Sequence, residues 1–194
     1  MNLKVNFLLS VLLTTLGAAL AIAQAPAAAP AAPATPGLTL SSPAFPDGGV
    51  IPNKFSQADP KPVSPKLEWT NVPANTASFV LMTIDPDTAV NKTTEEIVHW
   101  MAFNIPGDAR ELPEGVPVSA QMPNGATQAK NRRGEPGYMG MGAGAAGPYH
   151  HYSFYLYALD TKLSVGADAT RADVAKAMDG HILAKAVMVG RFHR

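Results

Sequence analysis

Residues 97–105 read IVHWMAFNI, and this segment decides the fold class. Side chains of an extended strand point alternately to its two faces. Here both faces are apolar, since Ile97, Met101 and Phe103 share the parity of His99 while Val98, Trp100 and Ala102 have the other. A strand that is apolar on both faces must be covered on both sides. The segment therefore predicts a strand in the middle of a sheet.

Three further segments, 79–84, 152–159 and 184–189, are rich in β-branched and aromatic residues and lie between Pro and Gly residues, which is typical of strands. Only one helical period is visible between strands, at 171–179, where Thr170 and Asp173 form a capping box and Gly180 follows. A single helix among several strands favours a mainly all-β fold. We expect an antiparallel β-sandwich with one short helix near the C-terminus.

The composition excludes several classes of protein. The chain has 194 residues, 46% of them hydrophobic, with 15 basic and 15 acidic residues and no cysteine. This hydrophobic content is too high for a disordered chain, and the length is too small for two large domains. A net charge of zero argues against a nucleic-acid partner, because that binding needs clustered Lys and Arg. Without cysteine, the chain can form neither disulfides nor thiolate metal sites.

The N-terminus has the order of a secretory signal. Residues 1–23 contain Lys4, then an apolar stretch, then small residues ending in Ala23. We predict cleavage after Ala23 and no stable membrane insertion afterwards, which places the mature protein in the periplasm or outside the cell. Residues 24–36 are rich in Ala and Pro and contain no charged residue, which predicts an extended linker. The folded domain is then 37–194.

Polar residues interrupt the predicted strands at a few places. Asp85 and Asp87 follow the strand 79–84, and alternate residues of an extended chain point the same way, although Pro86 makes a turn equally plausible. His99 is the one ionisable residue in its apolar strand, so it needs a hydrogen-bond partner. A merely structural role for each of these residues is the competing interpretation.

The last polar group opens the strand that contains 152–159. His150 and His151 are adjacent and should point to opposite faces, whereas His150 and Tyr152 share a face. These two could offer a ring nitrogen and a hydroxyl to one ligand. The alternative interpretation is a polar strand entrance. Further upstream, the glycine-rich segment 134–147 predicts a loop without regular structure.

The ordered motifs carry a resemblance to a known family. They are Ser41-Ser42-Pro43-Ala44-Phe45, Val63-Ser64-Pro65-Lys66-Leu67-Glu68-Trp69, Asp85-Pro86-Asp87, Val98-His99-Trp100, Asn104-Ile105-Pro106, His150-His151-Tyr152 and Leu156-Tyr157-Ala158-Leu159-Asp160. Their order resembles that of the phosphatidylethanolamine-binding protein family, and most closely its bacterial Raf-kinase-inhibitor-like branch. The resemblance implies an antiparallel β-sandwich with a small anion-accepting pocket, and it suggests a homodimer. The pocket residues that it implies are Asp85, Asp87, His99, His150 and Tyr152.

The leading hypothesis is an exported, non-enzymatic binding protein for a small anion or a phospholipid headgroup, with no cofactor. Two imidazoles and a tyrosine hydroxyl can supply donors to a phosphate or carboxylate. A carboxylate would repel such a ligand, so we expect Asp85 to hydrogen-bond His99 or His150 instead. Binding should then weaken as pH rises through the imidazole range.

Two alternatives belong to other classes. Asp85, His99 and His150 could ligate Zn or Cu, with Met139 and Met141 as soft ligands for reduced copper. A hydrolase is the second alternative, but the sequence has no Gly-x-Ser-x-Gly motif and no Cys, so it offers no recognisable nucleophile.

Overall fold

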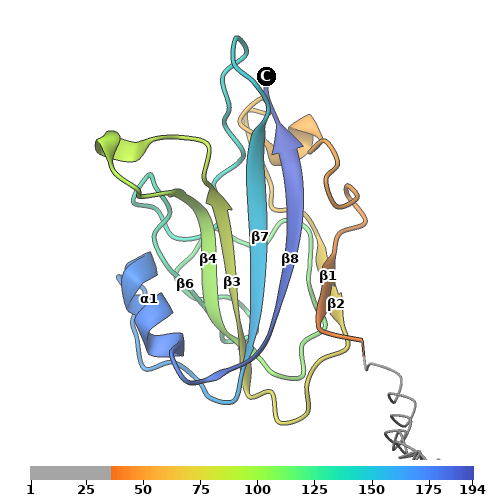
Figure 1. The fold of residues 1–194 in the computed structure, drawn as a ribbon, viewed down its shortest axis with the longest axis vertical. Coiled ribbons are helices and arrows are strands. Elements are labelled where there is room, and N and C mark those ends of the chain that lie inside the picture. Colours follow the sequence, from red (N-terminus) through yellow and green to blue (C-terminus); the bar gives the residue numbers. More distant parts are fainter. Residues whose placement is uncertain (1–35) are drawn as a thin grey trace, which may run out of the picture. The chain divides into compact units, whose positions relative to one another are not determined.

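A computed structural model describes residues 36–194 of the chain (Figure 1). The predicted signal 1–23 and the linker 24–36, apart from Pro36, lie outside the described residues. No helix within 36–194 has the length and apolar character needed to cross a membrane.

Five antiparallel strands form the larger sheet, in the order β6-β4-β3-β7-β8. Their bounds are β3 (Ser78–Asp85), β4 (Ile97–Pro106), β6 (Thr127–Gln128), β7 (His150–Leu159) and β8 (Ile182–Phe192). The four segments predicted as strands are the long strands of this sheet. Strand β4 lies between β6 and β3, with apolar residues buried on both of its faces, as its sequence predicts.

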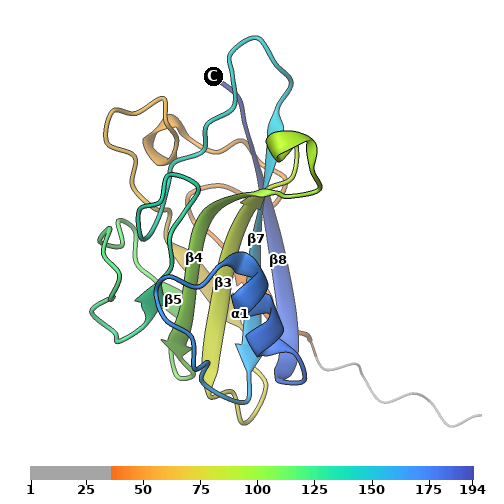
Figure 2. The same ribbon diagram turned by 90° about the vertical axis from the view of Figure 1, so that its left-hand side faces the viewer.

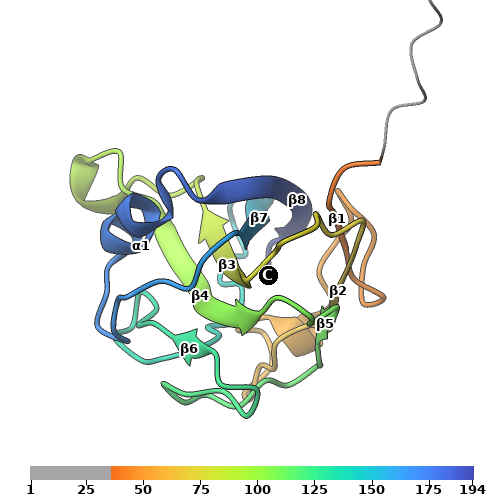
Figure 3. The ribbon, with the colours of Figure 1, turned by 90° about the horizontal axis from the view of Figure 1, so that it is seen from below.

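A second, three-stranded antiparallel sheet has the order β1-β2-β5. It consists of β1 (Thr39–Ser41), β2 (Leu67–Thr70) and β5 (Glu111–Leu112), none of which the hydrophobic pattern predicts. The main core fills the space between the two sheets, where Leu67 and Trp69 of β2 pack in one buried cluster with Phe79 of β3. Viewed from below, the smaller sheet covers one side of the larger one (Figure 3). This is the predicted sandwich.

Helix α1 (Arg171–Met178) covers the opposite face of the larger sheet (Figure 2). Its N-terminus has the predicted capping box, in which the Thr170 hydroxyl accepts from the Asp173 N–H and the Asp173 carboxylate accepts from the Thr170 N–H. Val174 and Met178 pack in a second buried cluster with residues of β3 and β4. Two single 3₁₀ turns, η1 (Asn53–Phe55) and η2 (Val90–Lys92), lie in loops, and residues 134–147 contain no helix or strand.

A β-bulge changes the orientation of His99. Thr83 of β3 pairs with Trp100, but the next residue, Ile84, pairs with Val98, so His99 is an extra residue in β4 with no partner in β3. The expectation that His99 shares the face of Met101 is therefore wrong. The bulge places the His99 ring on the main-core side of the sheet, 5.1 Å from the ring centroid of Tyr152.

Candidate functional site

Asp85 is the last residue of β3 and lies at one end of the larger sheet, with 3% of its surface exposed. Its two carboxylate oxygens have different partners. Oδ1 accepts a hydrogen bond of 2.9 Å from the Asp87 N–H, and Oδ2 lies 2.9 Å from Nδ1 of His150. The turn at Pro86 thus orients the carboxylate toward β7. The expectation that Asp85 pairs with a histidine is met by His150.

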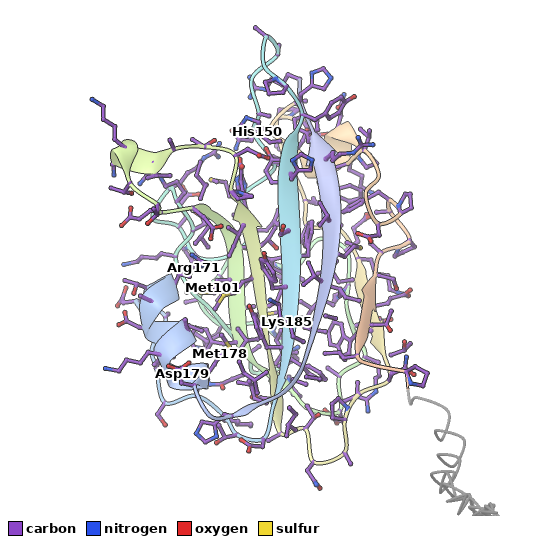
Figure 4. All side chains as sticks on the ribbon, in the orientation of Figure 1. Met101, His150, Arg171, Met178, Asp179 and Lys185 are labelled. Carbon is purple, nitrogen blue, oxygen red and sulfur yellow. The ribbon has the colours of Figure 1, made fainter. Side chains whose placement is uncertain are left out.

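His150 is the first residue of β7, the strand next to β3. Figure 4 labels it at that end of β7. Because an ionised carboxylate can only accept, Nδ1 of His150 carries the proton in its bond to Asp85. Its Nε2 is left for other partners. The His150 side chain is 20% exposed, so this atom belongs to a ring that solvent can reach.

Tyr152 lies two residues along β7 on the same face, and its side chain is buried. Its ring is perpendicular to the His99 ring and roughly parallel to the His150 ring, with centroid separations of 5.1 and 6.5 Å. The Tyr152 hydroxyl accepts a hydrogen bond of 3.1 Å from the Gly142 N–H. Burial, with the nearby Asp85 charge, raises the pKa of Tyr152 to about 12. The hydroxyl is therefore a permanent donor near neutral pH.

His99 faces the same cluster from β4. Its Nδ1 lies 3.0 Å from the carbonyl oxygen of Met139, and its own carbonyl accepts from the Met139 N–H at 2.7 Å. The carbonyl partner requires a proton on Nδ1, so Nε2 of His99, like that of His150, is the ring nitrogen left for other partners. Burial lowers the pKa of His99, although the Met139 carbonyl and the Asp85 charge favour its cation.

This lowered pKa predicts a specific loss of stability in acid. The unfolded chain protonates its histidines near pH 6.5, whereas His99 in the folded chain does so only at lower pH. Between those two values the unfolded state binds more protons, so the free energy of unfolding falls as pH decreases, by up to about 1.4 kcal/mol per pH unit. Urea unfolding from about pH 7 to pH 5 measures this slope. In a His99→Gln variant the slope should be smaller, and an unchanged slope contradicts the assignment.

Asp87 does not share the cluster with Asp85. Its Oδ2 accepts from the backbone N–H of His151 and lies 3.0 Å from Nδ1 of that ring. Partial burial opposes its ionisation, but the hydrogen bonds from His151 outweigh burial and lower the pKa of Asp87. The adjacent His150 and His151 point in different directions, as predicted. Each binds a different carboxylate of the Asp-Pro-Asp turn, because Pro86 ends the extended geometry that would have aligned the carboxylates.

A glycine-containing segment, 139–143, lies against the cluster and forms the wall of the site, because Met139 contacts His99 and the Gly142 N–H donates to Tyr152. Gln57 holds this wall in place. Gln57 donates from Nε2 to the Gly140 carbonyl and from its backbone N–H to the Met141 carbonyl, both at 2.8 Å. A Cβ at Gly142 would lie 2.4 Å from Nε2 of Gln57, so a larger residue there would have to displace the amide of Gln57. The sequence interpretation missed Gln57. The alternating glycines at 140 and 142 were the available signal for the tight packing.

The site therefore brings together Asp85, His99, His150 and Tyr152 from three adjacent strands, and it places Asp87 at the rim with His151. Within residues 36–194, no three His, Cys, Asp or Glu side chains are grouped so that they could hold a metal ion. The recorded ring partners of His99 and His150 are a carbonyl and a carboxylate rather than a serine hydroxyl. These contacts favour neither the metal-binding nor the hydrolase alternative.

Comparison with known proteins gives consistent results. The family model described as phosphatidylethanolamine-binding protein matches residues 41–193. A UPF0098 protein from Methanothermobacter thermautotrophicus is 38% identical over 157 residues, which cover 81% of this chain and 99% of the relative. A Mycobacterium tuberculosis protein named as a candidate lipoprotein is 36% identical over 161 residues, or 82% of this chain and 74% of that protein.

A solved structure is similar over the same region. The crystal structure of a phosphatidylethanolamine-binding protein homologue from Chlamydia trachomatis superposes with a TM-score of 0.70 at 35% identity. The match covers 81% of this chain and 98% of that one. The larger sheet, strands β2 and β5 and the four clustered side chains lie within the region matched by the family model, which begins at the last residue of β1.

Proposed function

This chain belongs to the phosphatidylethanolamine-binding protein family, and from that premise we propose that it is an exported, non-enzymatic binding protein for a small anionic or phosphorylated headgroup. The ligand contacts His99, His150 and Tyr152. The observation that carries the proposal is the convergence of these three rings beside a carboxylate that already has its own partners.

The chemistry of the four side chains supports an anion. Each imidazole uses Nδ1 within the protein, so each has Nε2 left for a ligand, and protonation turns that atom into a donor. The Tyr152 hydroxyl adds a third donor. Asp85 acts through His150, because its bonds to Asp87 and His150 occupy both oxygens and its charge stabilises the imidazolium.

Anion binding is consequently linked to protonation. A negative ligand beside His99 and His150 favours their cations, so the bound protein takes up protons and affinity falls as pH rises. Burial opposes the cation of His99 in the free site. The ligand charge offsets that penalty.

The proposed export comes from the sequence of residues 1–23, which has the order of a secretory signal. A periplasmic or extracellular location follows from it. The relative named as a candidate lipoprotein is compatible with an exported member of the family. Identification of the mature N-terminus by mass spectrometry tests this part: a start at Gln24 supports it, and a retained Met1 contradicts it.

Titration by NMR tests the ligand site. With inorganic phosphate, acetate or phosphoethanolamine at about pH 6, the ring signals of His99 and His150 should shift first. Those of His181 should not, because it lies in a separate ion pair with Asp160. Replacing Tyr152 by Phe removes one donor and should weaken binding by about tenfold. Tyr155→Phe on the other face of β7 is the matched control, and unperturbed His99 and His150 signals reject the proposal.

A further inference from the structure

The described chain contains three carboxylate–imidazole pairs, and they differ in their surroundings. The pairs are Asp85–His150, Asp87–His151 and Asp160–His181, with oxygen-to-Nδ1 distances of 2.9, 3.0 and 2.8 Å. The side chains of His151 and His181 are 52% and 47% exposed, against 20% for His150. Of these three histidines, the less exposed His150 has its ring beside Tyr152, whose other neighbour is the His99 ring.

The contacts of Asp85 give His150 a defined tautomer. Because Asp85 Oδ1 is held by the Asp87 N–H, Oδ2 stays directed at Nδ1 of His150. The proton then resides on Nδ1, and the neutral ring presents a lone pair on Nε2. A fixed carboxylate partner also stabilises positive charge that develops on the ring. The neutral ring is thus a nucleophile as well as a hydrogen-bonding group.

We propose that His150 is a phosphoryl acceptor, whose Nε2 takes a phosphoryl group from a small phosphoramidate or acyl phosphate bound in the anion site. This inference rests on the proposed function, because the donor must first bind there. With phosphoramidate, the Nε2 lone pair forms a bond to phosphorus while the P–N bond breaks. Because phosphoramidate near neutral pH is a zwitterion whose nitrogen already carries three protons, that electron pair leaves with neutral ammonia. The ring becomes a phosphorylated imidazolium, whose Nδ1 proton stays in the hydrogen bond to Asp85.

The neighbouring rings fit this transfer. The Tyr152 hydroxyl can donate to oxygens of the transferring group, which carry most of its charge, and the perpendicular His99 ring adds a donor when its Nε2 is protonated. Asp85 does not contact the phosphoryl group, so it is a positioning residue. The His181 pair has the same carboxylate contact and greater exposure, but neither His99 nor Tyr152 beside it. Selectivity for His150 over His181 therefore measures what the site adds.

Incubation of the full chain with phosphoramidate, followed by intact mass and ³¹P NMR, tests the inference. We expect one added phosphoryl group with the acid lability of a P–N bond, mapped by peptide mass spectrometry to His150. Its formation should be about tenfold or more faster than at His181 in the same molecule, because the site orients the donor. His150→Gln should abolish this modification, whereas His181→Gln should leave it unchanged.

Two negative results have different meanings. If phosphate shifts the His99 and His150 signals but phosphoramidate labels His150 no faster than His181, the phosphoryl-acceptor role is wrong and the binding function stands. If phosphate shifts neither signal, the binding proposal itself fails. Mapping in the wild-type chain keeps both results interpretable even where a variant does not fold.

Discussion

Replacing Asp85 by Asn is expected to move the ring proton of His150 from Nδ1 to Nε2 and to slow the phosphorylation of His150 by about 10- to 100-fold. A rate change of that size corresponds to the free energy of one strong hydrogen bond. The Asn carbonyl should keep the bond from the Asp87 N–H that Oδ1 of Asp85 now accepts. That leaves the amide NH₂ facing Nδ1 of His150, where it can only donate. The ring proton then moves to Nε2, which loses its lone pair.

Noncovalent binding should respond differently to the same change. An Nε2–H group still donates to an anion, so phosphate affinity at about pH 6 should fall by less than about tenfold. Ring ¹⁵N chemical shifts identify the tautomer, and phosphorylation rates and phosphate titrations measure the two activities. The matched control is Asp160→Asn, which should alter only His181. An unprotonated Nε2 in the Asp85→Asn protein would falsify the assigned role of Asp85.

The second large effect is expected in the wall of the site. A Cβ at Gly140 would lie 2.7 Å from Cβ of Pro62 and 3.0 Å from the carbonyl carbon of Ser56. Neither neighbour can rotate away, because one is a ring and the other is backbone. Gly140→Ala should therefore destabilise the protein by about 1–3 kcal/mol, which corresponds to a decrease in melting temperature of roughly 2–12 °C.

Gly144→Ala provides the control within the same loop, because a Cβ there has no neighbour within 4 Å. Thermal unfolding followed by circular dichroism should separate the two variants clearly. Gly140→Ala should also weaken phosphate binding, since Gly140 lies between Met139, which holds His99, and Gly142, which donates to Tyr152. Equal melting temperatures for the two variants would show that the wall does not pack tightly against Pro62.

The parts of the fold that could be predicted are those with strong local signals. The long strands β3, β4, β7 and β8 combine β-branched and aromatic residues with burial on at least one face, and the Thr170–Asp173 capping box marks the start of α1. The smaller sheet could not be found this way. Its strands have only two to four residues, too few for an alternating pattern, and tertiary contacts rather than local preference define them.

For the site, the types of residue could be predicted more fully than the orientations of their side chains. A carboxylate, two imidazoles and a tyrosine at strand ends are visible in the sequence, and their proximity follows from the adjacency of β4, β3 and β7. The orientation of His99 depends on a pairing irregularity, and the separation of Asp87 from Asp85 depends on the turn at Pro86. Neither has a periodic signature. Gln57 was missed because its role lies in contacts across 83 positions of the chain.

Because His99 is an extra residue in β4, its role in the anion site can be separated from the pairing that forms the sheet. If position 99 were deleted, Val98 and Trp100 would become neighbours and could pair with Ile84 and Thr83 without interruption. Such a shortened chain could assemble the same sandwich while lacking the His99 ring of the anion site. Shared topology with a relative therefore does not by itself establish shared binding chemistry, because the His99 ring depends on one residue inserted between Val98 and Trp100.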